Sequence, residues 1–547
     1  MFKKISEGTQ AVFLQKETDP IRIDNWQTFF GIILLLACGI KLYYGIQNSM
    51  DVQFADEAAY IRFGLDLFET MNRNWGPMYA LWYKCLSFIT TDTIQLYYLN
   101  FMITSVLVGV LLYFFLLRIS IKPTFALFIS FCVLVSDLNI SVWPRISHFC
   151  IVLCLIALII ISFLRNNIYK CLVFMVMCLI NAYARPEFYL SFVIMVIVTL
   201  ICIYYNKSVL TRKDIYIFSG IVILIGILHF IFRFPSNDFF GYNRGVAAFY
   251  QHYAWNYKMR TNGTFDAWLY WEDLAKKQFG DCNSMWCVIK TQPGIFISNT
   301  LFNVRTYLLQ LLKVCSYVFP VGIFHGKKMQ LLLTLLTIVT FITLLLRKNS
   351  RVYFLQKIYS YKFYLLILFC FITPTLLSCM VVFPRDHYLY LQMLFVLLIL
   401  ISAFGFIFEY LSLKPVFFIA FGILLFLATP NVQSYSFMKF STDTHAMCNK
   451  KLIQHLEKKY ANTPHTLFTN MPFVRGLLPT NFKEINTIFD KKKSKPFTHY
   501  IDSAKIDIVI ITPSTLRDPH LTSDSSWINF MDNPANYNFK KEIFCDC

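Results

Sequence analysis

The sequence lacks zinc-binding patterns, internal repeats and much of the usual charge. It contains no CxxC or HExxH pattern, and no segment recurs along the chain. Charged residues make up only 15% of the 547 residues, whereas hydrophobic residues make up 57% and aromatic residues 18%. Because a soluble surface does not tolerate this composition, we expect most of the chain to lie in a membrane.

Long apolar stretches support this expectation. Eleven of them are candidate transmembrane helices, at residues 26–44, 94–117, 123–135, 150–164, 171–182, 188–205, 215–232, 329–346, 363–382, 389–408 and 415–429. The third and fifth are shorter than the ~20 residues that cross the hydrocarbon core, so we expect them to be tilted or partly buried in protein. The sequence therefore predicts an α-helical polytopic membrane protein.

The distribution of basic residues predicts the orientation. Lys and Arg near helix ends are retained in the cytoplasm. With the amino terminus inside, the inner segments carry 17 basic residues and the short outer connections carry 6. An odd number of helices then places the carboxyl terminus outside. Lys3 and Lys4 precede the first helix as in a signal peptide, but no A-x-A-like cleavage site follows Tyr44, so we expect a retained helix.

The net charge of +19 does not predict a nucleic-acid partner, because the basic residues are spread over helix ends and loops. Most of the 16 cysteines lie in apolar stretches, where Cys behaves as a small hydrophobic residue. Cys282 and Cys287 lie in a predicted outer segment. A bridge between them is left open, since it depends on an oxidising compartment.

Three outer segments interrupt the membrane pattern. Residues 45–93 and 234–328 are expected as extracytoplasmic loops of a membrane module spanning 1–430, and the second is rich in Trp and Tyr, which favour the membrane interface. Within it, 295–318 predicts an amphipathic interfacial helix, or alternatively a twelfth span. Residues 431–547 have ordinary soluble composition and predict a small extracytoplasmic α/β domain.

That domain is predicted from local patterns. A helix is expected over 448–460, and short buried strands are expected to start at His465, Ile485 and Asp507.

An acidic pair, Asp56 and Glu57, follows the first helix on the predicted outer side, in the stretch FADEAAYIRFG. Carboxylates beside lipid are costly unless they face water or partners, which favours a functional role. A structural alternative is equally simple: the pair begins a helix, with Asp56 capping free backbone amides and both charges favoured by the helix dipole.

Further polar groups are expected on the same side. They are Asp137, Arg145 and His148 after the third helix, Arg185 and Glu187 between the fifth and sixth, and Arg385, Asp386, His387 and Tyr388 before the tenth. Singly, each is explained as a snorkelling or interfacial charge. Together they provide what transfer from a lipid phosphate requires, which is a base for the acceptor hydroxyl and cations for the departing phosphate.

Four motifs carry a resemblance to a known family. They are DEAAY after the first helix, GPMYALWYKCLSF, ARPE, and PRDHYLYLQMLFVLLIL entering a late helix. The order of these motifs and their predicted side of the membrane make residues 26–430 resemble the GT-C superfamily of integral-membrane glycosyltransferases. The resemblance is to the branch of protein O-mannosyltransferases and aminoarabinose transferases in particular.

The resemblance implies a GT-C-like fold and a donor sugar linked to polyprenyl phosphate. It implies Asp56 as the base, Glu57 as a group that orients the acceptor or helps to bind a divalent metal ion, and Arg145, Arg185 and Arg385 as ligands of the lipid phosphate. The remaining candidates for substrate contact are Tyr60, Asp137, His148, Glu187, His387 and Tyr388.

The sequence thus predicts a glycosyltransferase in a membrane, expected to be the bacterial plasma (inner) membrane. It would move a sugar from a polyprenyl-phosphate donor to a hydroxyl of an acceptor glycan, lipid or protein at the outer face. Two alternatives stay open: a transporter or flippase of a lipid-linked substrate, and a structural membrane subunit. Transporters often contain matching interrupted helices in two halves, and no such symmetry is visible in the sequence.

Overall fold

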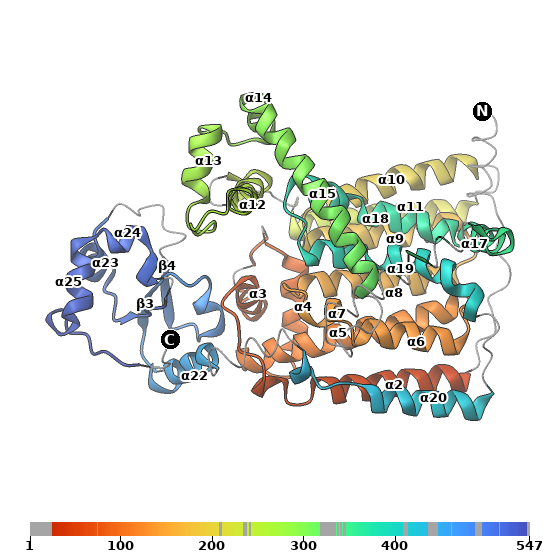
Figure 1. Cartoon of the computed structure of the whole chain (residues 1–547), viewed down its shortest axis with the longest axis horizontal. Coiled ribbons are helices and arrows are strands. Elements are labelled where there is room, and N and C mark those ends of the chain that lie inside the picture. Colours follow the sequence, from red (N-terminus) through yellow and green to blue (C-terminus); the bar gives the residue numbers. More distant parts are fainter. Residues whose placement is uncertain are drawn as a thin grey trace.

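A long helical bundle carries a smaller α/β domain at one end (Figure 1). The computed structural model describes residues 25–543 except 70, 74, 207–210, 234–237, 240–241, 318–334, 336–337, 340–341, 343–345, 409–413, 436–446, 461, 487–494 and 514. Within this part, eight helices are long and apolar enough to cross a membrane. They are α2 (Asn25–Tyr43), α5 (Thr93–Arg118), α8 (Ile146–Phe163), α9 (Asn167–Ala184), α10 (Phe188–Tyr205), α11 (Arg212–Phe232), α18 (Lys362–Val381) and α19 (Asp386–Phe408).

Two shorter apolar helices complete the described bundle, α6 (Pro123–Leu134) and α20 (Pro415–Ala428). At ~1.5 Å per residue, α6 is ~18 Å long and falls short of the ~30 Å hydrocarbon core, as expected for the third apolar stretch. The fifth stretch was expected to be short as well, but it belongs to the 18-residue α9, which Asn166 caps. The predicted span 329–346 lies largely outside the described residues, so the count of eleven stays a prediction.

Helix starts follow local sequence signals. Proline occupies the first turn of α6, α20 and α4 (Pro77–Leu86), where its missing amide hydrogen costs nothing. The Asp92 side chain accepts a hydrogen bond from the Gln95 amide and caps α5. These signals fix where the chain enters the bundle, and burial of the apolar faces fixes the packing.

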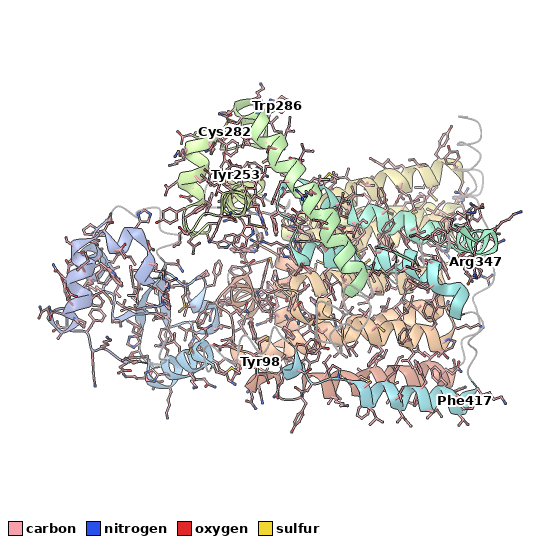
Figure 2. The ribbon with its side chains drawn as sticks, in the orientation of Figure 1. Tyr98, Tyr253, Cys282, Trp286, Arg347 and Phe417 are labelled. Carbon is pink, nitrogen blue, oxygen red and sulfur yellow. A yellow bond between two sulfur atoms is a disulfide. The ribbon has the colours of Figure 1, made fainter. Side chains whose placement is uncertain are left out.

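The bundle is built from successive helix pairs. α2 packs against α5, α6 and α20, α8 packs against α5 and α9, and α10 lies between α9 and α18. α19 packs against both α18 and α8. Figure 1 shows the C-terminal domain and the helices of residues 244–291 at one end of the bundle, and α17 (Lys348–Ser360) at the opposite end. Figure 2 likewise labels Arg347 far from Tyr253 and Cys282. The two ends therefore separate the segments that the sequence assigned to opposite sides of the membrane.

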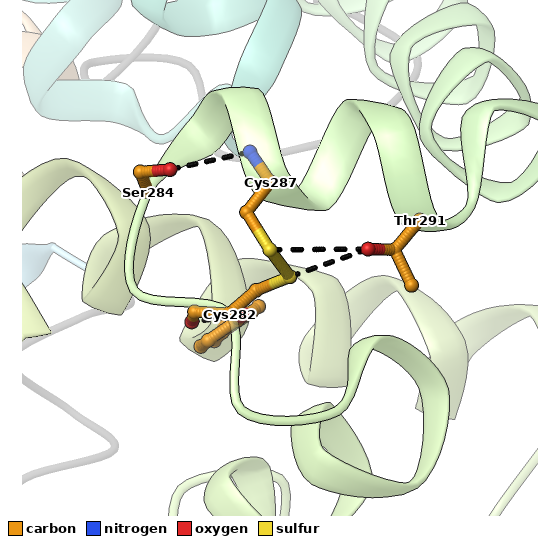
Figure 3. The surroundings of a disulfide bond; sticks show 5 residues. Cys282, Ser284, Cys287 and Thr291 are labelled. Atoms are coloured by element: carbon orange, nitrogen blue, oxygen red, sulfur yellow. Dashed lines mark hydrogen bonds between the residues drawn. A yellow bond between two sulfur atoms is a disulfide. The ribbon is translucent and has the colours of Figure 1, made fainter.

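The aromatic segment after α11 forms a helical cap. It contains α12 (Arg244–Thr261), α13 (Trp271–Phe279), α14 (Met285–Thr291) and α15 (Pro293–Tyr317). The first three share a core of buried rings around Phe249, Tyr250 and Phe279. A disulfide joins Cys282 to Cys287, and the Thr291 hydroxyl lies beside both sulfur atoms (Figure 3).

α15 confirms the expected helix and packs against α18 and α19. Its interfacial placement in a membrane stays a prediction.

The C-terminal domain contains a three-stranded parallel sheet in the order β4–β3–β5. The strands are β3 (His465–Thr469), β4 (Phe482–Asn486) and β5 (Ile508–Val509), accompanied by α22 (Cys448–Tyr460), α23 (Phe497–Ala504), α24 (Pro519–Thr522) and α25 (Ser525–Asp532). The predicted helix and the α/β composition are confirmed. The second strand begins at Phe482 rather than Ile485, because the Phe482 ring is buried and this residue pairs with His465. Cys448 is also disulfide-bonded.

Candidate active site

The acidic pair begins α3 (Asp56–Leu65), a short helix at the end of the bundle. The N-cap residue is Ala55, which has no side-chain capping bond, so Asp56 does not act as the N-cap. Both carboxylates lie in the first turn, where the positive end of the helix dipole favours them. Successive residues of an α-helix point ~100° apart, so Asp56 and Glu57 face different surroundings.

Glu57 points into the protein and is fully buried. Its Oε1 accepts hydrogen bonds from the hydroxyls of Tyr79 and Tyr83 and from Asn100 Nδ2 at 2.9 Å. Its Oε2 accepts the backbone amide of Arg145 at 3.0 Å. Burial raises the pKa of Glu57, and these donors oppose the rise. Glu57 therefore ties α3 to α4, α5 and the residue before α8.

A glycine makes room for this arrangement. Gly76 adopts φ +59°, and a Cβ there would lie 2.6 Å from Tyr60 Cε1 and 3.1 Å from the Ala184 carbonyl oxygen. Only glycine satisfies both the left-handed backbone and the close approach. The turn starts α4 at Pro77 and holds the Tyr60 ring against Tyr79, with centroids 5.0 Å apart.

Asp56 faces another direction and is half-buried, with three arginines near enough to act on its charge. Burial raises the pKa of Asp56, whereas Arg244, Arg385 and Arg185 each act to lower it. These arginines come from the start of α12, the residue before α19 and the end of α9. Three segments far apart in sequence thus converge on one carboxylate.

Arg185 is the best anchored of the three. Its Nε donates to Glu187 Oε1 at 2.7 Å and its Nη1 donates to Ser147 Oγ at 2.9 Å, while the guanidinium lies 5.2 Å from the centre of the Tyr388 ring. Burial raises the pKa of Glu187, but Arg185 and Arg244 outweigh that effect and the net shift is downward. Glu187 is therefore a carboxylate at neutral pH. The cluster contains three guanidinium groups and two carboxyl groups.

Arg385 lies beside the aromatic side chain of Trp268. Its guanidinium lies 4.6 Å from the centre of the Trp268 ring, and Trp268 lies 6.4 Å from His252 between ring centres. Burial first, and Arg385 second, hold the pKa of His252 well below its ordinary value. His252 Nδ1 is buried and has no hydrogen-bond partner among the described residues. His387 is buried close to Arg185, Arg385 and His252, against the Tyr388 ring. The site thus contains two imidazoles as well as guanidinium groups.

Three predicted residues lie elsewhere. The Arg145 guanidinium is fully buried over the Phe101 ring, and it donates to the carbonyl oxygens of Asn139 and Ile140 at 2.8 and 3.0 Å. His148 is buried as well, and it stacks on Tyr390 with ring centres 4.2 Å apart.

Asp137 starts α7 (Asp137–Ser141) and lies near Tyr435. The guanidinium of Arg145 and the imidazole of His148 contact the Asn139 carbonyl oxygen inside the bundle, so these two residues do not lie in the group around Asp56. The role expected of Asp137 stays a prediction. Asp56, Tyr60, Arg185, Glu187, Arg385, His387 and Tyr388 do lie together.

The acidic pair does not fit a shared metal ion. Glu57 has both oxygens engaged by hydrogen-bond donors, and Asp56 is surrounded by positive charge. In the described part of the chain, no group of three or more His, Cys, Asp and Glu side chains is placed to hold a metal. We therefore assign no step to a metal.

The sequence interpretation missed Arg244, His252 and Trp268. All three belong to the aromatic outer segment 234–328, which was expected to be an extracytoplasmic loop at the membrane interface. The available signal was Arg244 itself, a basic residue at the start of a helix in a segment assigned to the same side as Asp56.

Comparison of the chain with protein-family models, curated proteins and solved structures found no match. The geometry must therefore support a function by its own chemistry. It offers a half-buried carboxylate able to accept a proton, next to an excess of guanidinium groups able to bind a phosphate.

Proposed function

We propose that this protein is a glycosyltransferase that uses a polyprenyl-phosphate sugar as donor and an acceptor hydroxyl at the outer face of a membrane. One observation carries the proposal: Asp56 lies among Arg185, Arg244 and Arg385 at one end of a bundle of apolar helices. The resemblance of the sequence motifs to GT-C glycosyltransferases points the same way.

In the proposed reaction, Asp56 accepts the proton of the acceptor hydroxyl as that oxygen attacks the anomeric carbon of the sugar. The bond from the anomeric carbon to the phosphate oxygen breaks, and its electron pair leaves with the polyprenyl phosphate. A base in hydrogen-bond reach typically contributes ~10²–10⁴-fold to such a step. Asp56 suits this role, since its pKa is raised by burial and its carboxylate is not engaged as a helix cap.

The arginines serve the leaving group. Charge accumulates on the phosphate as the glycosidic bond breaks, and preorganised guanidinium groups stabilise that charge in a site with little water. Arg244 and Arg385 are the foremost candidates for this contact, because Arg185 is already paired with Glu187. The Trp268 ring lies 4.6 Å from the Arg385 guanidinium and can support it by a cation–π contact.

A flippase or transporter of a lipid-linked substrate is the second candidate, since it also needs cations that bind a lipid phosphate. The sidedness of the cluster favours chemistry. The acids and arginines gather at one end of the bundle, whereas transporter sites typically lie near the middle of the membrane.

The test is transfer by the purified full-length chain with a panel of synthetic polyprenyl-phosphate hexoses and pentoses, measured as released polyprenyl phosphate by mass spectrometry. Asp56→Asn keeps the shape but removes the base, so release should fall by ~10² or more with normal expression. Asp273→Asn is the matched control, because Asp273 is an exposed acid in the first turn of α13. Normal turnover by Asp56→Asn would refute the assignment.

For the acceptor, envelope glycans, lipids and glycoproteins are compared by mass analysis in cells with and without the chain. A missing sugar on one of these classes identifies the acceptor. The flippase is favoured if cells without the chain accumulate the lipid-linked sugar on the inner face and the purified protein transfers no sugar.

A further inference from the structure

The C-terminal domain packs directly against the helix that carries Asp56. Its short helix η5 (Val474–Leu477) lies on α3. The contact is so close that a Cβ on Gly476 would lie 2.2 Å from the Ala58 carbonyl oxygen and 3.1 Å from Ala58 Cβ. Ala58 is two residues from Asp56, within the same helical turn. No side chain fits at Gly476 unless α3 or η5 moves.

Neighbouring contacts reinforce this one. The Thr93 hydroxyl donates to the Leu477 carbonyl oxygen at 2.7 Å, and Arg62 Nη1 donates to the Leu478 carbonyl oxygen at 3.4 Å. The rings of Trp75 and Phe473 meet edge to face, with centroids 5.3 Å apart. The C-terminal domain thus contacts α3 itself, the turn after it and the start of α5.

A second contact lies on the other side of Asp56 in the sequence. Asp51 accepts the backbone amides of Asn449 and Lys450, each at 2.9 Å, and so caps α22 of the C-terminal domain. Lys450 Nζ lies 5.7 Å from the centre of the Tyr98 ring (labelled in Figure 2), where α22 meets the bundle. Residues 51 and 58 therefore form two docking points that flank Asp56.

The C-terminal domain is a folded unit that packs against the bundle at α3. It has its own buried core, formed by Phe468, Phe497, Trp527 and Phe530. At the docking face, Val474 and Leu477 are fully buried and belong to the same core as the bundle. A body with its own core that buries apolar side chains against a catalytic helix restricts the movement of that helix.

We propose that the C-terminal domain is a positioning module, which holds α3 from outside the bundle so that Asp56 stays among Arg185, Arg244 and Arg385. Glu57 holds the same helix from inside the bundle. Displacing a reacting group by ~1 Å can cost ~10²-fold in rate, so this support controls turnover rather than substrate affinity. The catalytic part of this inference rests on the proposed function.

The decisive substitution is Gly476→Ala in the full-length chain. We expect kcat for polyprenyl-phosphate release to fall ~10- to 100-fold with little change in KM for the donor. The midpoint of the pH–kcat profile should also move, because the burial of Asp56 and its three arginines sets the pKa of that carboxyl. The matched control is Gly294→Ala, at a glycine with nothing within 4 Å of the added Cβ, and it should retain wild-type values in both assays.

A structural readout works without any activity. Amide hydrogen exchange of α3, followed by mass spectrometry, should become faster in Gly476→Ala and, if that variant does not fold, in Asp51→Asn, which weakens the cap of α22. Wild-type exchange of α3 in the folded variants, or loss of kcat without a shifted pH midpoint, would overturn the positioning role. If the wild-type protein releases no polyprenyl phosphate, the proposed function fails while the exchange result still decides whether the domain holds α3.

Discussion

Substitution of Glu57 tests whether the buried member of the acidic pair is an anchor or a substrate-binding group. In Glu57→Gln the amide oxygen can still accept the hydrogen bonds that Tyr79, Tyr83 and Asn100 donate to Oε1 of the glutamate. The amide NH₂ then faces the backbone amide of Arg145, so a donor meets a donor. A buried donor left unpaired costs ~1–3 kcal/mol, and the surviving bonds lose the strength that a charged acceptor gives them.

Glu57→Ala removes the acceptor of the Tyr79 and Tyr83 hydroxyls and of the Arg145 backbone amide and opens a cavity, so we expect a loss above ~4 kcal/mol, the exceptional range for one substitution. The control is Glu69→Gln, because Glu69 is exposed beyond the end of α3 and should change stability by less than ~0.5 kcal/mol. The assay is thermal unfolding of the purified protein in detergent, followed by intrinsic fluorescence. We expect the midpoint temperature of unfolding to be highest in the control, lower in Glu57→Gln and lowest in Glu57→Ala.

Catalysis is measured on the same samples. An anchor should lower stability and turnover together, because a loosened α3 misplaces Asp56. If Glu57→Gln unfolded at the wild-type temperature but lost transfer ~10²-fold, Glu57 would contact substrate directly and the anchor interpretation would be wrong.

Three further predictions concern other parts of the molecule. Since burial raises the pKa of Asp56 and the base must be deprotonated, transfer should be lost as pH falls through a midpoint above the ordinary carboxyl value of ~3.9, which a pH–rate profile measures. Arg244→Lys removes the planar fork of a guanidinium, so KM for the donor should rise several-fold while the unfolding temperature stays normal. Arg145→Lys should instead lower the unfolding temperature, because the Arg145 guanidinium binds carbonyl oxygens inside the bundle. The reverse pattern would exchange the roles of the two arginines. Cysteines introduced at Lys348 and Lys505 should react with a membrane-impermeant reagent from opposite sides, because these exposed positions lie at opposite ends of the molecule; labelling from one side only would refute the predicted topology.

Much of the architecture was predictable because it follows from local sequence. Ten of the eleven apolar stretches coincide with described helices, since a run of apolar residues must form a helix to satisfy its backbone in lipid. Residues 448–460 form the predicted amphipathic helix, and His465 begins the predicted strand. The second strand was misplaced by three residues, because burial of Phe482 depends on what packs above it and not on the local pattern.

The candidate site was predictable only as a list of polar groups on one side. The sequence placed Asp56, Arg185 and Arg385 on that side, and the structure brings them together. It also placed Arg145 and His148 there, but their side chains turn into the bundle and bind its carbonyl oxygens. Sidedness follows from where the helices begin and end, whereas the direction of a side chain depends on its neighbours in three dimensions.

The sequence by itself determined that the chain is a helical membrane protein with an α/β domain after it, because hydropathy and helix periodicity are local properties. Only the tertiary structure decided that Asp56 and Glu57, adjacent in the chain, do different work. The ~100° turn between them sends one carboxylate toward arginines from three distant segments and the other into a buried network of tyrosines. The same packing brings Gly476 against Ala58, across more than four hundred residues of chain, where Val474 and Leu477 of η5 are buried in the core of the bundle.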